Sequence, residues 1–110
     1  MLQVFARPLG RIVDPSEVTA FAIRNEILSA ASFASFITSV DGAMYYGANL
    51  QDLIDRSNIF VDRILRGAKP ADLPVELPNK FDLILNLKTL RAIGIPVPKN
   101  VLLQATEVIE

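Results

Sequence analysis

The sequence predicts an α/β fold, in which short, at least partly parallel strands flanked by helices form an incomplete three-layer arrangement. Segments that favour strands alternate along the chain with segments that favour helices, which is the order that builds parallel sheets covered by helices. The strands are too few for a complete doubly wound domain. At the same time 51% of the 110 residues are hydrophobic. We therefore expect a further subunit or a longer parent chain to cover part of this apolar surface.

The first part of the chain is predicted to hold short strands around one helix. Residues 2–5 and 11–13 favour strands and are separated by a proline and a glycine. Asp14 and Pro15 have the chemistry of a helix N-cap and a first helical residue. Apolar residues at helical spacing continue this helix to about Ala31.

A second strand region is expected between this helix and the middle of the chain. Residues 33–40 mix aromatic and β-branched side chains with serine and threonine in rough alternation, which fits a strand or a continuing helix end, and we favour the strand. Asp41 and Gly42 are a turn signal. Residues 43–46 then form a short buried strand that Gly47 closes.

The clearest predicted element is a helix that begins after Asn49. Apolar residues recur at i, i+3, i+4 and i+7 between residues 50 and 65, with charged residues on the opposite side. Asn49 is a favoured N-cap residue, and Gly67 lies where a C-terminal glycine cap belongs. Residues 69–79 contain three prolines and are predicted to be an extended connector.

The last part of the chain is predicted to be one strand followed by two short helices. Residues 81–87 alternate strongly apolar side chains with others, as a strand does. Residues 89–93 form a short helix that Gly94 ends. A last helix begins at Pro98 or Lys99 and runs through about Ala105.

The composition excludes several classes of function. The chain has no cysteine and no histidine, so it lacks a thiol nucleophile, an imidazole base, a disulfide and an ordinary zinc or copper site. Its net charge is −1 and no run of basic residues is present, which argues against nucleic acid and anionic membranes as partners. No stretch qualifies as a membrane span or a secretory signal, so a complete gene product of this sequence would stay in the cytoplasm.

Carboxylate pairs give no sign of catalysis. Asp52 with Asp55, and Glu107 with Glu110, lie on amphipathic or terminal segments where solvated charge is the expected state. We therefore assign no catalytic residue, no metal ligand and no cofactor, and we expect a protein that is not an enzyme.

Three residues are candidates for binding a ligand. Tyr45 and Tyr46 end a short strand just before a helix N-terminus, where ligands of open α/β sheets bind. An aromatic ring there can stack on a flat solute, although both tyrosines also fit a core or an interface. Asn49 could offer its amide to a carboxylate, or it could simply cap the helix.

The most specific signal is an ordered series of residues in the second part of the chain. It comprises Tyr46-Gly47, Asn49-Leu50, the run VDRILRGAKPADLPVE over residues 61–76, Pro78, Lys80-Phe81, residues 86–89, Gly94, Pro96 and Glu107-Val108-Ile109. This series resembles the C-terminal part of the ABC-transporter substrate-binding protein family, which is type I periplasmic-binding-protein-like, and within it the aromatic amino-acid binders. Residues 46–110 carry the resemblance, and residues 1–45 are a diverged preceding unit of the same single α/β domain.

The resemblance implies a non-catalytic role in transport. Members of the family fold into two α/β lobes joined by a hinge, trap a small solute such as an amino acid in the cleft, and deliver it to a membrane permease from the periplasm. The tyrosine segment of the family lies near that cleft. This chain corresponds to about the last third of such a protein, so we expect a solute-binding component or a truncated fragment of one. The alternative is a homodimeric structural or interaction module that reuses the fold without binding solute.

Overall fold

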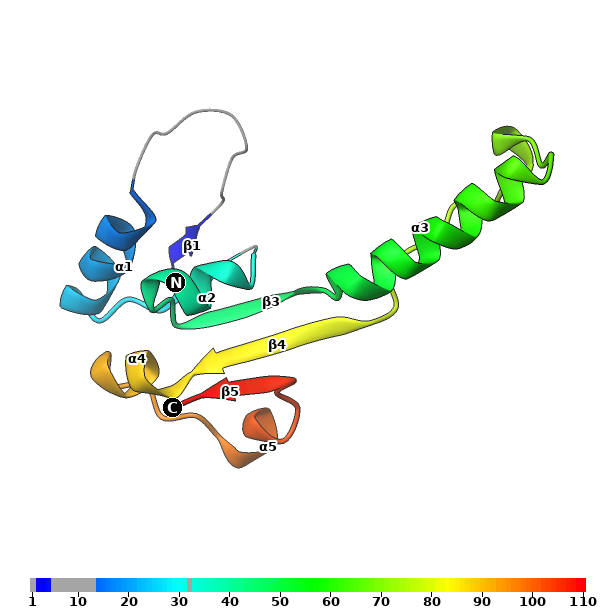
Figure 1. Ribbon diagram of the computed structural model, residues 1–110. Coiled ribbons are helices and arrows are strands. Elements are labelled where there is room, and N and C mark those ends of the chain that lie inside the picture. The colour runs from blue at the N-terminus through cyan, green and yellow to red at the C-terminus, as the bar shows by residue number, and fades with distance from the viewer. Residues whose placement is uncertain (1, 5–13, 32) are drawn as a thin grey trace. The chain divides into compact units, whose positions relative to one another are not determined.

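The computed structural model of the protein describes residues 2–4, 14–31 and 33–110 (Figure 1). The strand predicted at residues 11–13 lies outside the described residues. The chain divides into two compact units. Unit 1 contains Met1–Gly47 and Asp82–Glu110, and unit 2 contains Ala48–Phe81. The two units are described in turn.

The strands form one sheet in which their order follows the sequence. They are β1 (Leu2–Val4), β2 (Ser29–Ala31), β3 (Met44–Ala48), β4 (Phe81–Asn86) and β5 (Glu107–Ile109). β1 and β2, β2 and β3, and β4 and β5 pair in parallel. β3 and β4 run in opposite directions, as Figure 1 shows, and the Asn86 N–H donates to the Ala43 carbonyl at 3.0 Å. The predicted α/β sheet with partly parallel strands is therefore confirmed.

Helix α1 (Pro15–Arg24) begins as predicted but ends earlier. The Asp14 carboxylate accepts a hydrogen bond from the Ser16 backbone N–H at 2.9 Å, so Asp14 is the N-cap. At the other end Glu26 takes a φ of 54°, and the Ile27 N–H donates back to the Ala22 carbonyl. The expectation of a helix up to Ala31 is wrong, because this turn releases the chain into β2.

The strand expected at residues 33–40 is also wrong, because Ser35–Val40 form helix α2. Ile37 is the reason, since its side chain is 1% exposed and packs in a core cluster with Tyr45 and Ile84. A helix places Ile37 and Val40 on one side. The helix ends at Asp41, which has a φ of 55°.

Two short helices and an unexpected strand complete unit 1. In α4 (Leu87–Ala92) the Asn86 side chain caps the helix by accepting from the Thr89 N–H at 3.1 Å. α5 (Lys99–Leu102) begins where expected but is shorter than predicted. The chain then forms β5, which the sequence did not indicate.

The core of unit 1 lies on both faces of the sheet. Ala43, Leu85, Leu90 and Ile93 form one buried cluster, whereas Ile37, Tyr45 and Ile84 form the other. Because neighbouring residues of a strand point to opposite faces, Ile84 and Leu85 bury β4 from both sides. Helix α2 contributes to one cluster and α4 to the other, so this part of the chain has three layers.

Unit 2 is helix α3 (Leu50–Leu65) with the segment that returns along it, which includes a short 3-10 helix at Pro70–Asp72. The predicted cap residues are confirmed: the Asn49 side chain accepts from the Asp52 N–H at 2.8 Å, and Gly67 has a φ of 100°. Apart from the 3-10 turn, the proline-rich connector contains no helix or strand, and Lys69 and Leu73 on either side of the turn have an extended backbone. No residue of α3 is buried. No helix in the described part of the chain combines the length and the apolar composition needed to cross a bilayer.

Candidate functional site

Tyr45 lies in the core of unit 1. Its side chain is 7% exposed and belongs to the cluster of Ile37 and Ile84. The phenol lies over Gly47, since a Cβ built there would be 2.6 Å from the Tyr45 hydroxyl oxygen. Burial raises the pKa of Tyr45 above its ordinary value, and the negative charge of Asp82 raises it further. The ring therefore supports the end of β3 from one face of the sheet.

Tyr46 points to the other face of β3 and is 61% exposed. In the parallel register Ala31, the last residue of β2, lies opposite Tyr45, so Tyr46 is one residue beyond the carboxyl end of β2. Phe33 follows β2 and is 53% exposed. The expectation that Gly47 closes the strand is wrong, because β3 continues through Gly47 to Ala48 and Tyr46 is its third residue. Phe33 and Tyr46 are thus two exposed aromatic residues near the carboxyl end of β2, where ligands of open α/β sheets bind.

The sequence did not indicate Phe33 as a site residue, because the alternation of residues 33–40 predicts a strand, whereas Phe33 lies in the loop before α2. The signal that could have found it is positional. An aromatic residue just beyond the carboxyl end of a parallel strand lies where it can contact a solute. Recognising Phe33 in this way requires a strand to be predicted at Ser29–Ala31.

Asn49 belongs to unit 2 and caps α3 there. Of the two roles considered for this side chain, the structure has the capping role, because its oxygen accepts from the Asp52 backbone N–H. The Asn49 backbone N–H also donates to the Lys80 carbonyl at 3.0 Å, which joins the two ends of unit 2.

The carboxylate of Asp52 is held in its charged form. Lys80 approaches it to 2.8 Å and Arg56 to 2.9 Å. The hydrogen bond from Lys80 is the main cause of a lowered Asp52 pKa, and Arg56 contributes in the same direction. A general acid needs a raised carboxyl pKa, so this environment is the opposite of the one that acid catalysis requires. No group of three potential ligands that could hold a metal ion occurs among the described residues.

Comparison with protein families identifies the chain. The family model described as ABC transporter substrate binding protein matches residues 30–109. The chain belongs to this family. The match confirms the predicted resemblance to this family and begins at residue 30, within β2.

Solved structures support the same fold. A conserved domain protein from Vibrio cholerae is 21% identical, has a TM-score of 0.73, and is matched over 86% of this chain. An ABC domain in complex with L-Trp from Streptococcus pneumonia is 26% identical with a TM-score of 0.70 over 84% of this chain. A ligand-free, open structure of a substrate-binding protein with adhesive properties from Clostridium difficile is 24% identical with a TM-score of 0.65 over 86% of this chain.

The matched region is a limited part of each of these proteins. It covers 31% of the Vibrio cholerae chain, 32% of the Streptococcus chain and 31% of the Clostridium chain. No curated protein matches the chain in sequence. The chain therefore has the fold of part of a periplasmic-binding-protein lobe and spans about a third of its solved relatives.

Proposed function

We propose that this chain is a solute-binding component of an ABC transporter, or a fragment of one, that contributes part of an inter-lobe cleft and catalyses no reaction. The observation that supports this proposal is the family match over residues 30–109, which includes the sheet edge at β2 and β3. In the longer relatives the remaining two thirds of the chain supply the other elements. The full cleft therefore needs a longer parent chain or a second copy, and its partners are a membrane permease and a periplasmic solute.

Tyr46 is the residue to which we assign contact with the solute. Its ring is exposed on β3, one residue beyond the carboxyl end of the neighbouring strand β2, and Phe33 follows β2. Aromatic rings of this kind stack on flat apolar groups such as an indole or a phenyl ring. Tyr45 supports the strand from the opposite face, and Asn49 fixes the start of the helix that follows it. The L-Trp complex of a relative makes aromatic amino acids the first solutes to test.

Isothermal titration with L-tryptophan, L-phenylalanine and L-leucine tests this assignment. Loss of a stacking ring weakens binding by about 5- to 10-fold, so Tyr46→Ala should reduce the affinity for tryptophan by that factor. Phe21→Ala is the matched control, because Phe21 is 51% exposed on α1, away from the end of β3. Equal affinities of Tyr46→Ala and the unchanged protein would contradict the role of Tyr46.

Light scattering on the same samples tests the need for assembly. We expect heat of binding from assembled particles and little or none from the isolated chain, since one wall of a cleft buries only part of a solute. Heat evolved by a monodisperse monomer would contradict this requirement. No heat in any state of assembly, with any of the three amino acids, would contradict solute binding itself.

The alternative is a homodimeric structural module that binds no solute, and the surface of α3 favours it. One side of this helix carries exposed apolar residues: Leu50 (66%), Ile54 (46%), Val61 (53%), Ile64 (41%) and Leu65 (82%). At 100° per residue these positions share one face, which a second copy could cover.

A pair of equally exposed residues tests this alternative. Val61 lies on the apolar face, whereas Ile59 is also 53% exposed but lies two positions away, on the opposite side of the helix. If α3 forms a dimer, Val61→Asp should produce monomers while Ile59→Asp stays dimeric in light scattering. A strictly monomeric particle of the unchanged protein at micromolar concentration would remove this alternative.

A further inference from the structure

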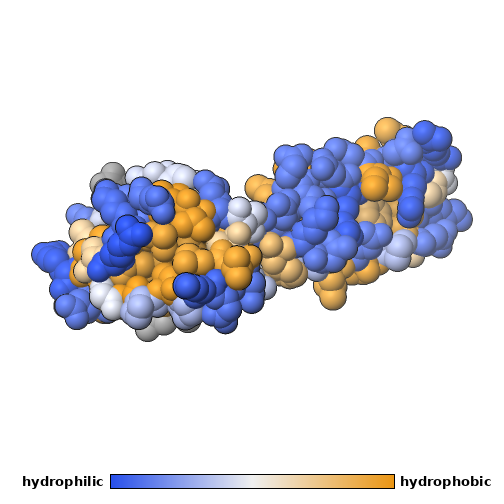
Figure 2. Space-filling model, turned by 90° about the horizontal axis from the view of Figure 1, so that it is seen from below, coloured by the Kyte–Doolittle hydropathy of each residue, from blue (hydrophilic) through white to orange (hydrophobic). Residues whose placement is uncertain are grey.

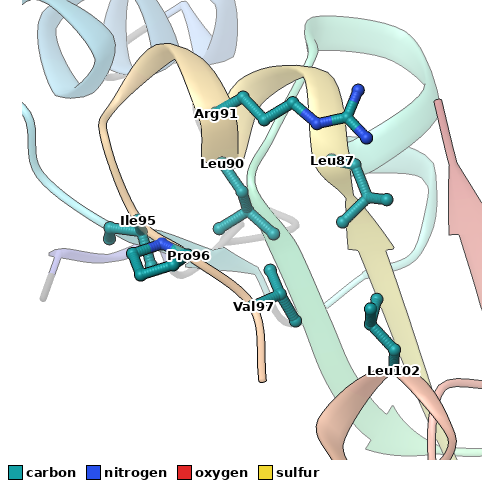
Figure 3. Close-up of a pocket in the computed structure, with 7 residues that line it drawn as sticks. All are labelled: Leu87, Leu90, Arg91, Ile95, Pro96, Val97 and Leu102. Atoms are coloured by element: carbon teal, nitrogen blue, oxygen red, sulfur yellow. The ribbon is translucent and has the colours of Figure 1, made fainter. Parts of the chain in front are cut away.

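An apolar pocket of about 210 Å³ lies in unit 1 between α4, α5 and the segment that joins them (Figure 3). Leu87 and Leu90 line it from α4, residues 95–97 line it from the joining segment, and Leu102 lines it from α5. Leu90 is 3% exposed and belongs to the core. The space-filling view in Figure 2 shows apolar residues gathered on a face of unit 1 beside hydrophilic ones.

The walls of this pocket are fixed by the backbone. Gly94 ends α4 with a φ of 70°, and the Ile95 N–H donates to the Leu90 carbonyl at 2.9 Å. Pro96 and Pro98 keep the joining segment extended, because proline fixes φ near −65°. The Pro98 carbonyl then accepts from the Val101 N–H at 3.0 Å and starts α5. The backbone of the joining segment is therefore constrained along one wall of the pocket.

The size of the pocket indicates what it can hold. Sites that enclose a whole small ligand have volumes of about 300 to 1,000 Å³. An apolar cavity of about 150 Å³ already accommodates a benzene molecule. A volume of about 210 Å³ lies between these limits, so it suits one bulky apolar side chain of a partner better than an entire solute.

The charge around the pocket indicates which residues should flank that side chain in the partner. No acidic residue occurs between Asp82 and Glu107, whereas Lys88, Arg91 and Lys99 are in this stretch. Arg91 lines the pocket, and in Figure 3 its side chain extends toward Leu87. Within the described part of the chain Arg91 has no ion pair, whereas the Lys88 Nζ pairs with an Asp41 carboxylate oxygen at 3.9 Å. An acidic partner would meet the unpaired positive charge of Arg91 here.

We propose that this pocket is a docking site for an acidic polypeptide, which inserts one phenylalanine or leucine side chain flanked by carboxylates. The apolar side chain would fill the cavity over Leu90, and a carboxylate beside it would lie near Arg91. The site is independent of the solute, because it uses residues of α4 and α5 and none of the aromatic residues at the end of β3.

Nuclear magnetic resonance of the full chain with labelled leucine and valine methyl groups tests the proposal. The probe is a capped peptide of one phenylalanine between two pairs of glutamates, and its titration should shift the methyl signals of Leu90, Val97 and Leu102. Replacing the peptide phenylalanine by alanine should weaken binding by about tenfold or more. Replacing the glutamates by lysines should abolish it. Binding of the lysine peptide with equal affinity, or no shift at millimolar glutamate peptide, would overturn the proposal.

Protein variants separate this site from general charge attraction. Arg91→Gln should weaken binding by about 2- to 5-fold, as expected for a partly exposed ion pair. Arg24→Gln removes an equal charge from exposed α1 and should leave the affinity unchanged. Val97→Phe should occupy the cavity with its own ring and abolish the shifts while circular dichroism stays native. Equal losses in Arg91→Gln and Arg24→Gln, or shifts of the same methyl signals on concentrating the protein alone, would contradict an acidic partner in this pocket.

Discussion

Replacing Thr89 by valine should destabilise unit 1, because the Thr89 hydroxyl donates to the Asp41 carbonyl at 2.8 Å. The bond joins α4 to the turn that follows α2, and Thr89 is 3% exposed. Valine has nearly the same volume as threonine but cannot donate. The Asp41 carbonyl would thus lose its donor without any change in packing, which isolates the contribution of this hydrogen bond.

The expected loss is about 1 to 2 kcal/mol in the free energy of unfolding. A typical hydrogen bond contributes about 1 kcal/mol net, and a partly buried acceptor left without a donor adds to the cost. Threonine and valine have similar helix propensities, so the helix itself contributes little to the difference. With the slopes usual for small proteins, the midpoint of urea unfolding should fall by roughly 0.5 to 1.5 M.

Thr19→Val is the matched control for this measurement. Thr19 is also 3% exposed, but its hydroxyl donates to the Pro15 carbonyl within α1 at 3.2 Å. That carbonyl is still the i−4 acceptor for the helical N–H of residue 19, so no acceptor is left without a donor. We expect a change below about 0.5 kcal/mol. Equal urea midpoints for Thr89→Val and Thr19→Val, at unchanged slope, would refute the reasoning.

Three further predictions concern local geometry and charge. Gly42→Ala should cost about 1 to 3 kcal/mol in urea unfolding, because the new Cβ would collide with the ring of Phe36; the cost should shrink in a Phe36→Leu background, and strict additivity would argue against the collision. Gly94→Ala should lower the free energy of unfolding by about 1 to 2 kcal/mol, because Gly94 has a φ of 70° and alanine is strained there. No atom lies within 4 Å of the added carbon, so a neutral effect would contradict the role of this backbone strain. Lys80 is the main cause of the lowered Asp52 pKa, so the ionised Asp52 stabilises the fold fully at pH values above the unfolded-state pKa near 3.8. This stabilisation is lost as the pH falls through the lower folded-state pKa. Asp52→Asn should therefore flatten the pH dependence of the free energy of unfolding in this acidic range, and an unchanged profile would disprove the assignment.

Elements with complete local signals could be predicted from the sequence. Helix α3 has a capping asparagine at its start, an apolar periodicity of 3.6 along its length, and a glycine in the left-handed region just beyond its end. β4 shows alternation, and it is a central strand buried on both faces near its end. In both cases the residue pattern and the packing favour the same structure.

The elements that sequence reasoning missed are fixed by tertiary contacts. Helix α1 ends at a turn in which Glu26 has a positive φ, and glutamate gives no local signal for such a turn. Residues 35–40 alternate like a strand, but packing of Ile37 makes them a helix. β5 is three residues long and exists because it pairs with β4 from Ile84 to Asn86. So short a segment carries too little periodicity to be recognised.

The candidate site was predicted only in part for the same reason. Tyr45 and Tyr46 are adjacent in sequence and share one residue type, so the pattern could not separate a buried ring from an exposed one. Tyr45 is buried and Tyr46 is exposed because α2 packs on the face of β3 that carries Tyr45. Phe33 is a candidate only because β2, which it follows, pairs with β3.

The closure of unit 2 by the Asn49 N–H and the Lys80 carbonyl has a practical consequence. When an insertion begins and ends at one hydrogen-bonded pair between two antiparallel strands, its length can change without shifting the register of those strands. A short hairpin turn could therefore be grafted between Gly47 and Asp82, and a reporter peptide could be inserted at Gly67, where no atom lies within 4 Å of the Cβ position.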